Sequence, residues 1–156
     1  MRAVVQRVTD ATVVVGDLTV GSIKSGLVVY VGISHDDGVA DVNYVVGKVL
    51  GLRVFTDQAG KMNLSIVDLK DVRNSSALGI LAISQFTLYG DVRKGRRPSY
   101  NEAAPPEYAR PLFDQVVDGL QVSGLRIATG EFGAHMDVKY VNDGPVTILI
   151  DSKKEF

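Results

Sequence analysis

The chain has 156 residues, no Cys and no Trp, and its 17 basic and 18 acidic residues give a formal net charge of −1. This length fits one domain over residues 1–156 that buries its core without disulfides, and the lack of Cys excludes a disulfide framework and a thiolate metal site. Because the charge is near zero, the molecule as a whole does not attract a polyanion, and any contact with nucleic acid must be local.

No segment has the pattern of a membrane anchor or a secretory signal. The N-terminal residues alternate too early into charged side chains for a signal peptide, and no apolar stretch approaches the roughly 18 residues of a membrane span. We therefore expect a cytoplasmic protein, with neither a membrane nor DNA as a partner.

The first part of the chain has the alternation of an antiparallel sheet. Residues 2–8 alternate in polarity, and the runs 11–15 and 18–23 flank Gly16-Asp17, a pair that favours a two-residue hairpin turn. The nearly continuous apolar run 26–33 is typical of a central strand that is buried on both faces.

The segment after this strand has the spacing of a helix. Over residues 39–52 the apolar residues recur at i, i+3, i+4 and i+7, which predicts a helix with one buried face. Asp36-Asp37 just before it are expected to be turn and helix-capping residues. Residues 53–55 are expected to return to a strand, and a short helical turn is expected near residues 65–69.

A second helix is predicted after Pro105-Pro106 and before Gly124, because the apolar residues again keep helical spacing. Pro111 is unfavourable beyond the first turn, so the regular helix is expected to begin later than Pro106. Three further strands are predicted, over residues 125–129, 136–141 and 146–150. These elements predict an α+β fold in a single domain, with a curved antiparallel β-sheet covered by two main helices.

Two short motifs contain residue types that suggest a function in addition to a structural role. Residues 141–147, Val-Asn-Asp-Gly-Pro-Val-Thr, combine turn formers with a Gly that permits close approach and a Pro that permits a cis bond. A hairpin turn between two strands is the ordinary alternative. The second motif, Ser84-Gln85-Phe86-Thr87-Leu88, places polar residues at the end of the apolar run 78–83.

These two motifs in this order, with residues 1–8 and 132–136, resemble the D-aminoacyl-tRNA deacylases, and the resemblance covers essentially the whole chain. It implies an enzyme that hydrolyses the ester bond between a D-amino acid and tRNA, so that the main partner is an aminoacyl-tRNA. It also implies a barrel-like sheet and a homodimer whose active sites lie at the subunit interface. The alternatives are a non-catalytic RNA-binding module and a relative that edits L-aminoacyl-tRNA.

The usual hydrolytic side chains are scarce. His35 and His135 are the only histidines, so a Ser-His-Asp triad would need His135 to meet Ser84 or Thr87 with a carboxylate behind it. Two isolated histidines also lack the ligand spacing of a zinc hydrolase. We therefore expect no metal and no other cofactor.

Thr87 has three interpretations. Its hydroxyl could act as a nucleophile, although no base is evident, or it could be an ordinary strand residue. Alternatively, the backbone N–H groups around Phe86 and Thr87 could form an anion hole for the tetrahedral intermediate of ester cleavage. We favour the anion hole, because an aminoacyl ester is already activated and the neighbouring ribose 2′-hydroxyl can assist. The resemblance implies main-chain recognition and a role for that RNA hydroxyl, but the threonine has also been proposed as the nucleophile, so both roles stay open.

Gly144-Pro145 matches the family's Gly-cis-Pro element, which one subunit inserts into the active site of the other to screen chirality; Ser84 and Gln85 are expected to bind the substrate. Arg7 is either the anchor of this element or an exposed charge on an edge strand. Phe86 either contacts the terminal adenosine or is a core aromatic. Carbonyl oxygens beside the substrate Cα would exclude an L side chain by steric clash. Glycine has no side chain to clash with them, so glycyl-tRNA is expected to be cleaved too.

One dense basic cluster follows the second motif. It consists of Arg93, Lys94, Arg96 and Arg97. The cluster is either a solvated loop or, because it lies beside a candidate site, a set of phosphate contacts to tRNA.

Overall fold

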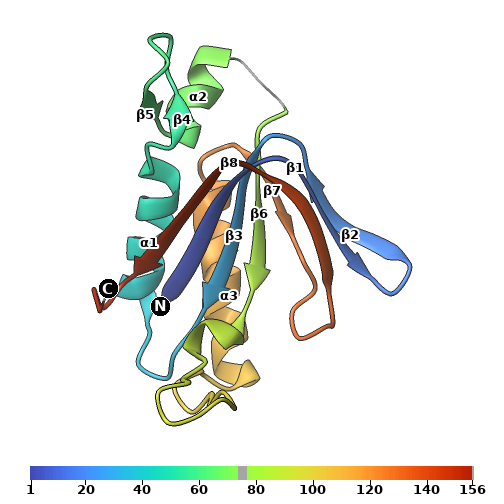
Figure 1. The fold of residues 1–156 in the computed structure, drawn as a ribbon, viewed down its shortest axis with the longest axis vertical. Coiled ribbons are helices and arrows are strands. Elements are labelled where there is room, and N and C mark those ends of the chain that lie inside the picture. The colour runs from blue at the N-terminus through green and yellow to red at the C-terminus, as the bar shows by residue number, and fades with distance from the viewer. Residues whose placement is uncertain (74–76, 156) are drawn as a thin grey trace.

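The structure, a computed structural model, describes residues 1–73 and 77–155 and contains one large curved sheet (Figure 1). The helices are α1 (Val39–Gly51), α2 (Ile66–Arg73), α3 (Pro106–Gln121) and a short 3-10 helix, η1 (Phe86–Tyr89). The strands are β1 (Arg2–Val15), β2 (Leu18–Ile23), β3 (Gly26–Gly32), β4 (Phe55–Thr56), β5 (Met62–Leu64), β6 (Gly79–Ser84), β7 (Arg126–Thr129) and β8 (Asp137–Asp151). In the part of the chain that the structure describes, no helix is long and apolar enough to cross a membrane.

The sheet has the strand order β2-β1-β3-β6-β7, and β8 pairs with the remaining edge of β1. The predicted α+β class and the curved, barrel-like sheet covered by two main helices are confirmed. The sheet is mixed rather than antiparallel throughout, since β6 pairs in parallel with both β3 and β7. The physical reason is that the connections carrying α1 and α3 cross over one face and return the chain in the same direction.

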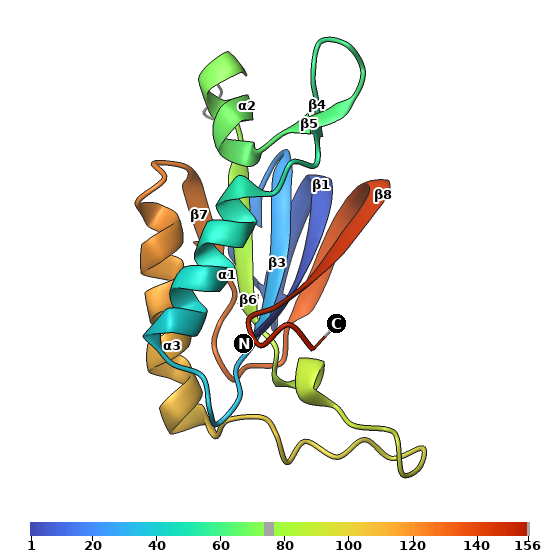
Figure 2. The ribbon, with the colours of Figure 1, turned by 90° about the vertical axis from the view of Figure 1, so that its left-hand side faces the viewer.

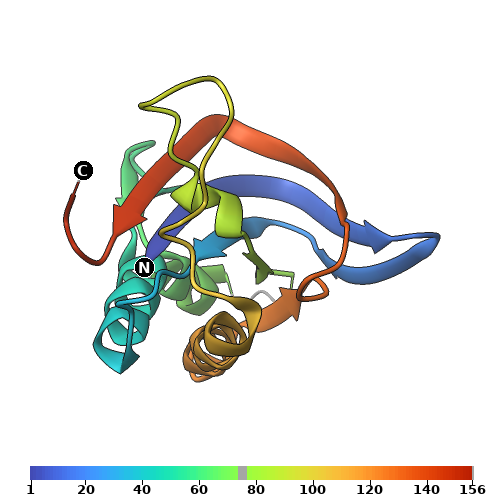
Figure 3. The ribbon, with the colours of Figure 1, turned by 90° about the horizontal axis from the view of Figure 1, so that it is seen from below.

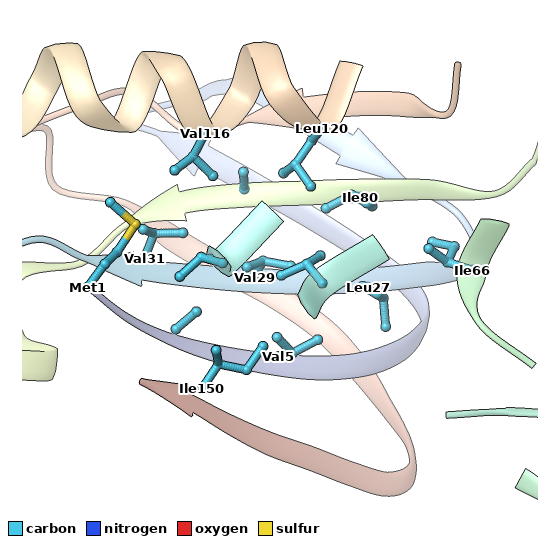
Figure 4. Packing of buried hydrophobic residues seen from close by; sticks show 14 of the residues in the cluster. Met1, Val5, Leu27, Val29, Val31, Ile66, Ile80, Val116, Leu120 and Ile150 are labelled. Carbon is cyan, nitrogen blue, oxygen red and sulfur yellow. The ribbon is translucent and has the colours of Figure 1, made fainter. Parts of the chain in front are cut away.

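Two cores hold the layers together. Figure 2 shows α1 and α3 on the same side of the sheet. The larger core fills the space between these helices and the sheet. Figure 4 shows fully buried side chains of this core, among them Val5, Leu27, Ile80, Val116 and Leu120. A smaller cluster lies on the opposite face, where the sheet curves round on itself (Figure 3), and contains Val8, Val13, Ile23, Val28 and Leu81.

Glycine at position 21 allows the sheet to curl almost into a barrel. Gly21 lies in β2, which approaches β7 without pairing with it, and a Cβ at this position would collide with the carbonyl oxygen of Thr129. Only a residue without a side chain permits two backbones to come this close.

The predicted helices are present, with one start that differs from the prediction. The helix expected over residues 39–52 is α1, and the short turn expected near residues 65–69 is the first part of α2. The expectation that the second helix begins after Pro106 is wrong, because α3 starts at Pro106 and contains Pro111. Pro111 and Glu107, whose carbonyl loses its helical donor, are both exposed. Water can therefore satisfy that carbonyl, which reduces the cost of the proline.

The start of α1 is capped by a different carboxylate from the predicted ones. Asp37 accepts a hydrogen bond from the Ser34 N–H at 2.8 Å, which makes it a turn residue. Asp41, one turn inside the helix, accepts the Gly38 N–H at 2.9 Å and is therefore the capping carboxylate.

Asp41 also joins α1 to the C-terminal segment. It accepts a hydrogen bond from the Ser152 hydroxyl at 2.6 Å, and its Oδ1 lies 2.8 Å from Nζ of Lys153. Burial raises the pKa of this carboxyl, but the hydrogen bonds from Lys153, Ser152 and the Gly38 N–H outweigh burial and keep the pKa well below its ordinary value.

We predict that Asp41→Asn lowers the free energy of unfolding at neutral pH by about 1–3 kcal/mol, because it leaves charged and hydrogen-bonding partners unmatched. The pKa of Asp41 is lower in the folded than in the unfolded chain. Its contribution is therefore complete above the unfolded-state pKa of about 4 and is lost as the pH falls below it. When urea unfolding is measured from neutral to acid pH, the free energy of unfolding should fall more steeply in the parent than in the variant. Asp114→Asn, at an exposed position of α3, is the control, and an equal acid loss in parent and Asp41→Asn would contradict the assignment.

Candidate functional site

The second motif lies where β6 ends and the chain turns across the sheet. The N–H of Gln85 still donates to the Val31 carbonyl at 2.8 Å, and η1 begins at the next residue. Gly32 makes room for this turn, because a Cβ there would lie 2.9 Å from Cβ of Leu88 and 3.0 Å from the Gln85 carbonyl oxygen. The motif is therefore a turn on the end of a rigid central strand rather than an extension of that strand.

Two adjacent backbone donors are open at this turn. Phe86 and Thr87 are the first residues of η1, and the first N–H groups of a helix have no partner within it. Within residues 1–73 and 77–155 neither of these N–H groups donates a hydrogen bond, whereas the N–H groups of Leu88 and Gly90 donate to Gln85 and Thr87. The two free donors satisfy the first requirement of the predicted anion hole. Thr87 itself is exposed.

Phe86 opens onto a cavity. It is 57% exposed, so the alternative that it is a core aromatic is wrong. Its ring packs edge-on against Tyr100, with centroids 5.0 Å apart and an interplanar angle of 71°. The adjoining cavity of about 480 Å³ is lined by Ser84, Gln85 and Phe86 together with mostly apolar residues that include Tyr100, Ala104, Phe132 and Met136.

Most of the lining residues were outside the predicted site. Tyr100 and Ala104 lie in the segment between the basic cluster and α3, where no periodicity marks a residue as part of a cavity. Phe132 and Met136 belong to a segment that carries the resemblance, but no role was predicted for them. A cluster of apolar residues in an otherwise polar loop region is the one sequence signal that could have indicated them.

The first motif lies inside one continuous strand. The strands predicted over residues 136–141 and 146–150 are present but form one strand, β8, which pairs with β1 on both sides of residues 143–146, so the hairpin alternative between them is wrong. Gln6 pairs with Thr147 and Val8 pairs with Asn142, so a single β1 residue stands opposite four residues of β8, positions 143–146. Gly144-Pro145 is therefore the centre of a large bulge, and its peptide bond is cis.

Arg7 is the residue opposite this bulge. Its side chain is only 13% exposed, and β1 has neighbours on both sides, so the exposed edge-strand alternative is wrong. Its Nη1 donates to the Val54 carbonyl, and its Nε lies 2.8 Å from Oδ2 of Asp143. The second contact is an ion pair rather than a directed hydrogen bond. A Cβ on Gly144 would lie 3.1 Å from Nη2 of Arg7, so the guanidinium packs directly behind the bulge.

The two motifs lie at opposite ends of the same sheet. The bulge stands opposite Arg7, which pairs with Leu27, and Leu27 pairs with Ile80 near the start of β6, whereas Ser84 at the end of β6 pairs with Val31. Four residues of strand separate these levels, which is about 13 Å. In Figure 1 the bend of β8 is accordingly at the top and η1, in yellow-green, near the bottom. Within one chain the motifs do not form one site.

The basic cluster forms an exposed loop beyond η1. The loop is closed by hydrogen bonds of 2.8 and 2.9 Å between Asp91 and Ser99. Arg93 donates to both carboxylate oxygens of Asp91, which lowers the pKa of Asp91 to about 2. Among the described residues no carboxylate forms an ion pair with the other three cations, Lys94, Arg96 and Arg97. Three exposed charges thus remain available on this loop.

Other hydrolytic arrangements find no support in the described residues. His35 contacts the Asn101 carbonyl at 3.1 Å, and neither histidine is within hydrogen-bond distance of Ser84 or Thr87. In the same ranges no group of three or more His, Asp or Glu side chains is placed to hold a metal ion. The available chemistry is therefore that of backbone donors beside an apolar cavity.

Known proteins are similar to this chain over nearly its full length. The family model described as D-Tyr-tRNA(Tyr) deacylase matches residues 4–151. Proteins named D-aminoacyl-tRNA deacylase from Thermosipho africanus and Thermotoga petrophila are 52% and 53% identical over 156 residues, which is the full length of each pair of chains.

Two solved structures share the fold. One, described as c-Myc DNA Unwinding Element Binding Protein, has a TM-score of 0.87 at 40% identity and covers 97% of this chain and 98% of that chain. The other, described as a probable eukaryotic D-amino acid tRNA deacylase, has a TM-score of 0.79 at 18% identity and covers 96% and 97%. The second likeness concerns the fold alone.

Proposed function

The chain belongs to the D-aminoacyl-tRNA deacylase family, and from this premise we propose how its geometry performs the reaction. The protein is a hydrolase that cleaves the ester bond between a D-amino acid and tRNA, releasing both. The observation that carries this conclusion is the match at about half identity over the full length of curated relatives. Since this substrate is formed where translation takes place, we propose a cytoplasmic location.

In the proposed mechanism, the free N–H groups of Phe86 and Thr87 bind the oxyanion that forms when the ester carbonyl is attacked. Donors already aimed at developing charge lower the barrier without reorganising. The ribose 2′-hydroxyl next to the ester assists its cleavage, so that no side-chain base is required. Ser84 and Gln85 line the cavity and contact the substrate.

The cavity beside Phe86 suits the terminal adenosine of tRNA. Its lining is mostly apolar and includes the contacting rings of Phe86 and Tyr100. Unstacked bases are commonly bound against aromatic side chains in this way. This places the ester next to the free N–H groups of η1.

The chiral filter requires a second copy of the chain. Gly144-Pro145 is about 13 Å from the end of β6 along the strands of its own subunit. In a homodimer with a two-fold axis, the bulge of each subunit can reach the site of the other. β8 offers a surface for this contact, since it pairs only with β1 and exposes Val141 and Leu149, which are 60% and 58% exposed.

Gly144 and Pro145 then discriminate by rejection. Carbonyl oxygens beside the substrate Cα exclude an L side chain by steric clash, while a D side chain points away from them. Glycine has no side chain to exclude, so glycyl-tRNA is a second substrate.

The direct test compares three substrates. We expect purified, EDTA-treated protein to release the amino acid from D-tyrosyl-tRNA and glycyl-tRNA and to leave L-tyrosyl-tRNA largely intact. Release of no amino acid would support a non-catalytic RNA-binding module, and preference for the L substrate would indicate an L-editing enzyme. Resistance of glycyl-tRNA alone would contradict the rejection mechanism.

Replacement of Thr87 separates the backbone from the hydroxyl. We predict that Thr87→Ala retains most of the rate of D-tyrosyl-tRNA cleavage, because alanine keeps the N–H. Thr56→Ala, a change of the same kind at an exposed position of β4, is the control. A single-turnover rate lowered about 10⁴-fold, the scale of losing a catalytic nucleophile, would instead assign the reaction to the hydroxyl.

The basic loop is predicted to contact phosphates. Arg96→Ala and Arg97→Ala should each weaken binding of intact aminoacyl-tRNA and lower its salt dependence by about one unit of logarithmic slope. They should leave cleavage of a minimal D-aminoacyl-adenosine unchanged, since that substrate lacks the contacted phosphates. Lys48→Ala, an exposed cation on α1, is the matched control. Equal losses on both substrates would place the arginines in the active site or the fold.

A further inference from the structure

The bulge at Gly144-Pro145 has a geometric weakness. Four residues of β8 stand opposite Arg7, and the regular ladder resumes on either side at the Asn142–Val8 and Thr147–Gln6 pairs. The extra residues of a strand bulge can move along the strand by a two-residue shift of register, which keeps each side chain on its own face of the sheet. Something must therefore keep the base of the bulge between these two pairs.

Arg7 holds one face of the bulge only. Its guanidinium contacts Asp143 and the Val54 carbonyl on the face that carries the larger core. Alternate residues of β1 point to opposite faces, so Gln6 lies on the other face, which the helices do not cover.

A chain of side-chain hydrogen bonds lies on that uncovered face. Tyr140 donates from its hydroxyl to Oε1 of Gln6 at 2.7 Å, and Gln6 donates from Nε2 to Oγ1 of Thr147 at 3.1 Å. Asn142 closes the base of the bulge, because its Nδ2 lies 3.4 Å from both Oγ1 of Thr147 and the Val146 carbonyl oxygen. The chain thus joins the two residues on either side of the bulge to each other and to β1.

The direction of these bonds is consistent along the chain. Tyr140 uses its own proton on Gln6, which orients the Gln6 amide so that Nε2 faces Thr147. Hydrogen bonds that donate in one direction strengthen one another. The bond from Gln6 to Thr147 is therefore strengthened by the bond from Tyr140 to Gln6.

We propose that Thr147, Gln6 and Tyr140 are positioning residues for chiral selection, which hold the Gly144-Pro145 bulge in one register. This inference rests on the proposed function. A steric wall separates D from L substrates only if its atoms stay within about 0.5 Å of their place, so a bulge free to shift would admit the L side chain. The residues do not contact the substrate and act through the backbone of β8.

The test uses matched threonine variants and the ratio of kcat/KM for D-tyrosyl-tRNA to that for L-tyrosyl-tRNA. Thr147→Val keeps the branched shape but loses the acceptor, and it should lower the ratio about tenfold through faster cleavage of the L substrate. Thr147→Ser restores the hydroxyl and should restore the ratio to within about twofold of the parent. Thr12→Val, the same change on β1 away from the bulge, should leave the ratio unchanged.

A second variant covers the case in which Thr147→Val fails to fold. Tyr140→Phe removes only the first hydroxyl of the chain and should lower the ratio in the same direction. An unchanged ratio in the folded Thr147→Val or Tyr140→Phe protein, or an equal fall in Thr147→Ser, would overturn the proposal while leaving the deacylase function intact. A parent protein that cleaves neither substrate would remove the proposed function and this inference together.

Discussion

The pairing of β1 with three other strands is the constraint on which both halves of the site depend. Along one edge β1 pairs with β8 for almost its full length, and along the other it pairs first with β3 and then with β2. The pairing with β8 sets the register of the bulge, while the pairing with β3 fixes the strand on which β6 and η1 are placed. Since β1 belongs to both ladders, the distance between the two motifs is fixed by backbone hydrogen bonds.

Local patterns predicted the elements but not every connection between them. The 3.6-residue spacing of Val42, Val45 and Val49 identified α1, because one face of that helix is buried. The parallel pairing of β6 depends on where a crossover returns the chain, and no local pattern contains that information. The continuity of β8 was missed because Asn, Asp, Gly and Pro favour turns, and here the tertiary pairing with β1 overrides that preference.

The candidate site was predictable where residue type limits the chemistry. Two isolated histidines and no Cys left backbone donors as the main means of stabilising an oxyanion, and the structure leaves the N–H groups of Phe86 and Thr87 free among the described residues. Tyr100 and Ala104 could not be predicted, because a cavity wall is assembled from segments whose proximity only the fold determines. The burial of Arg7 was equally hidden, since a central and an edge strand look alike in a short alternating segment.

A filter for handedness is well made from main-chain atoms. A side-chain wall can change rotamer, and its size would discriminate among amino acids as well as between enantiomers. A carbonyl oxygen fixed in a strand bulge occupies the same position for every substrate and tests only the side of Cα on which a substituent lies. Under the proposed mechanism, the enzyme therefore accepts D-amino acids of varied size. The accuracy of this filter then depends on how firmly β8 is held in place. Arg7 holds one face of the bulge, and the hydrogen-bonded chain that ends at Thr147 holds the other.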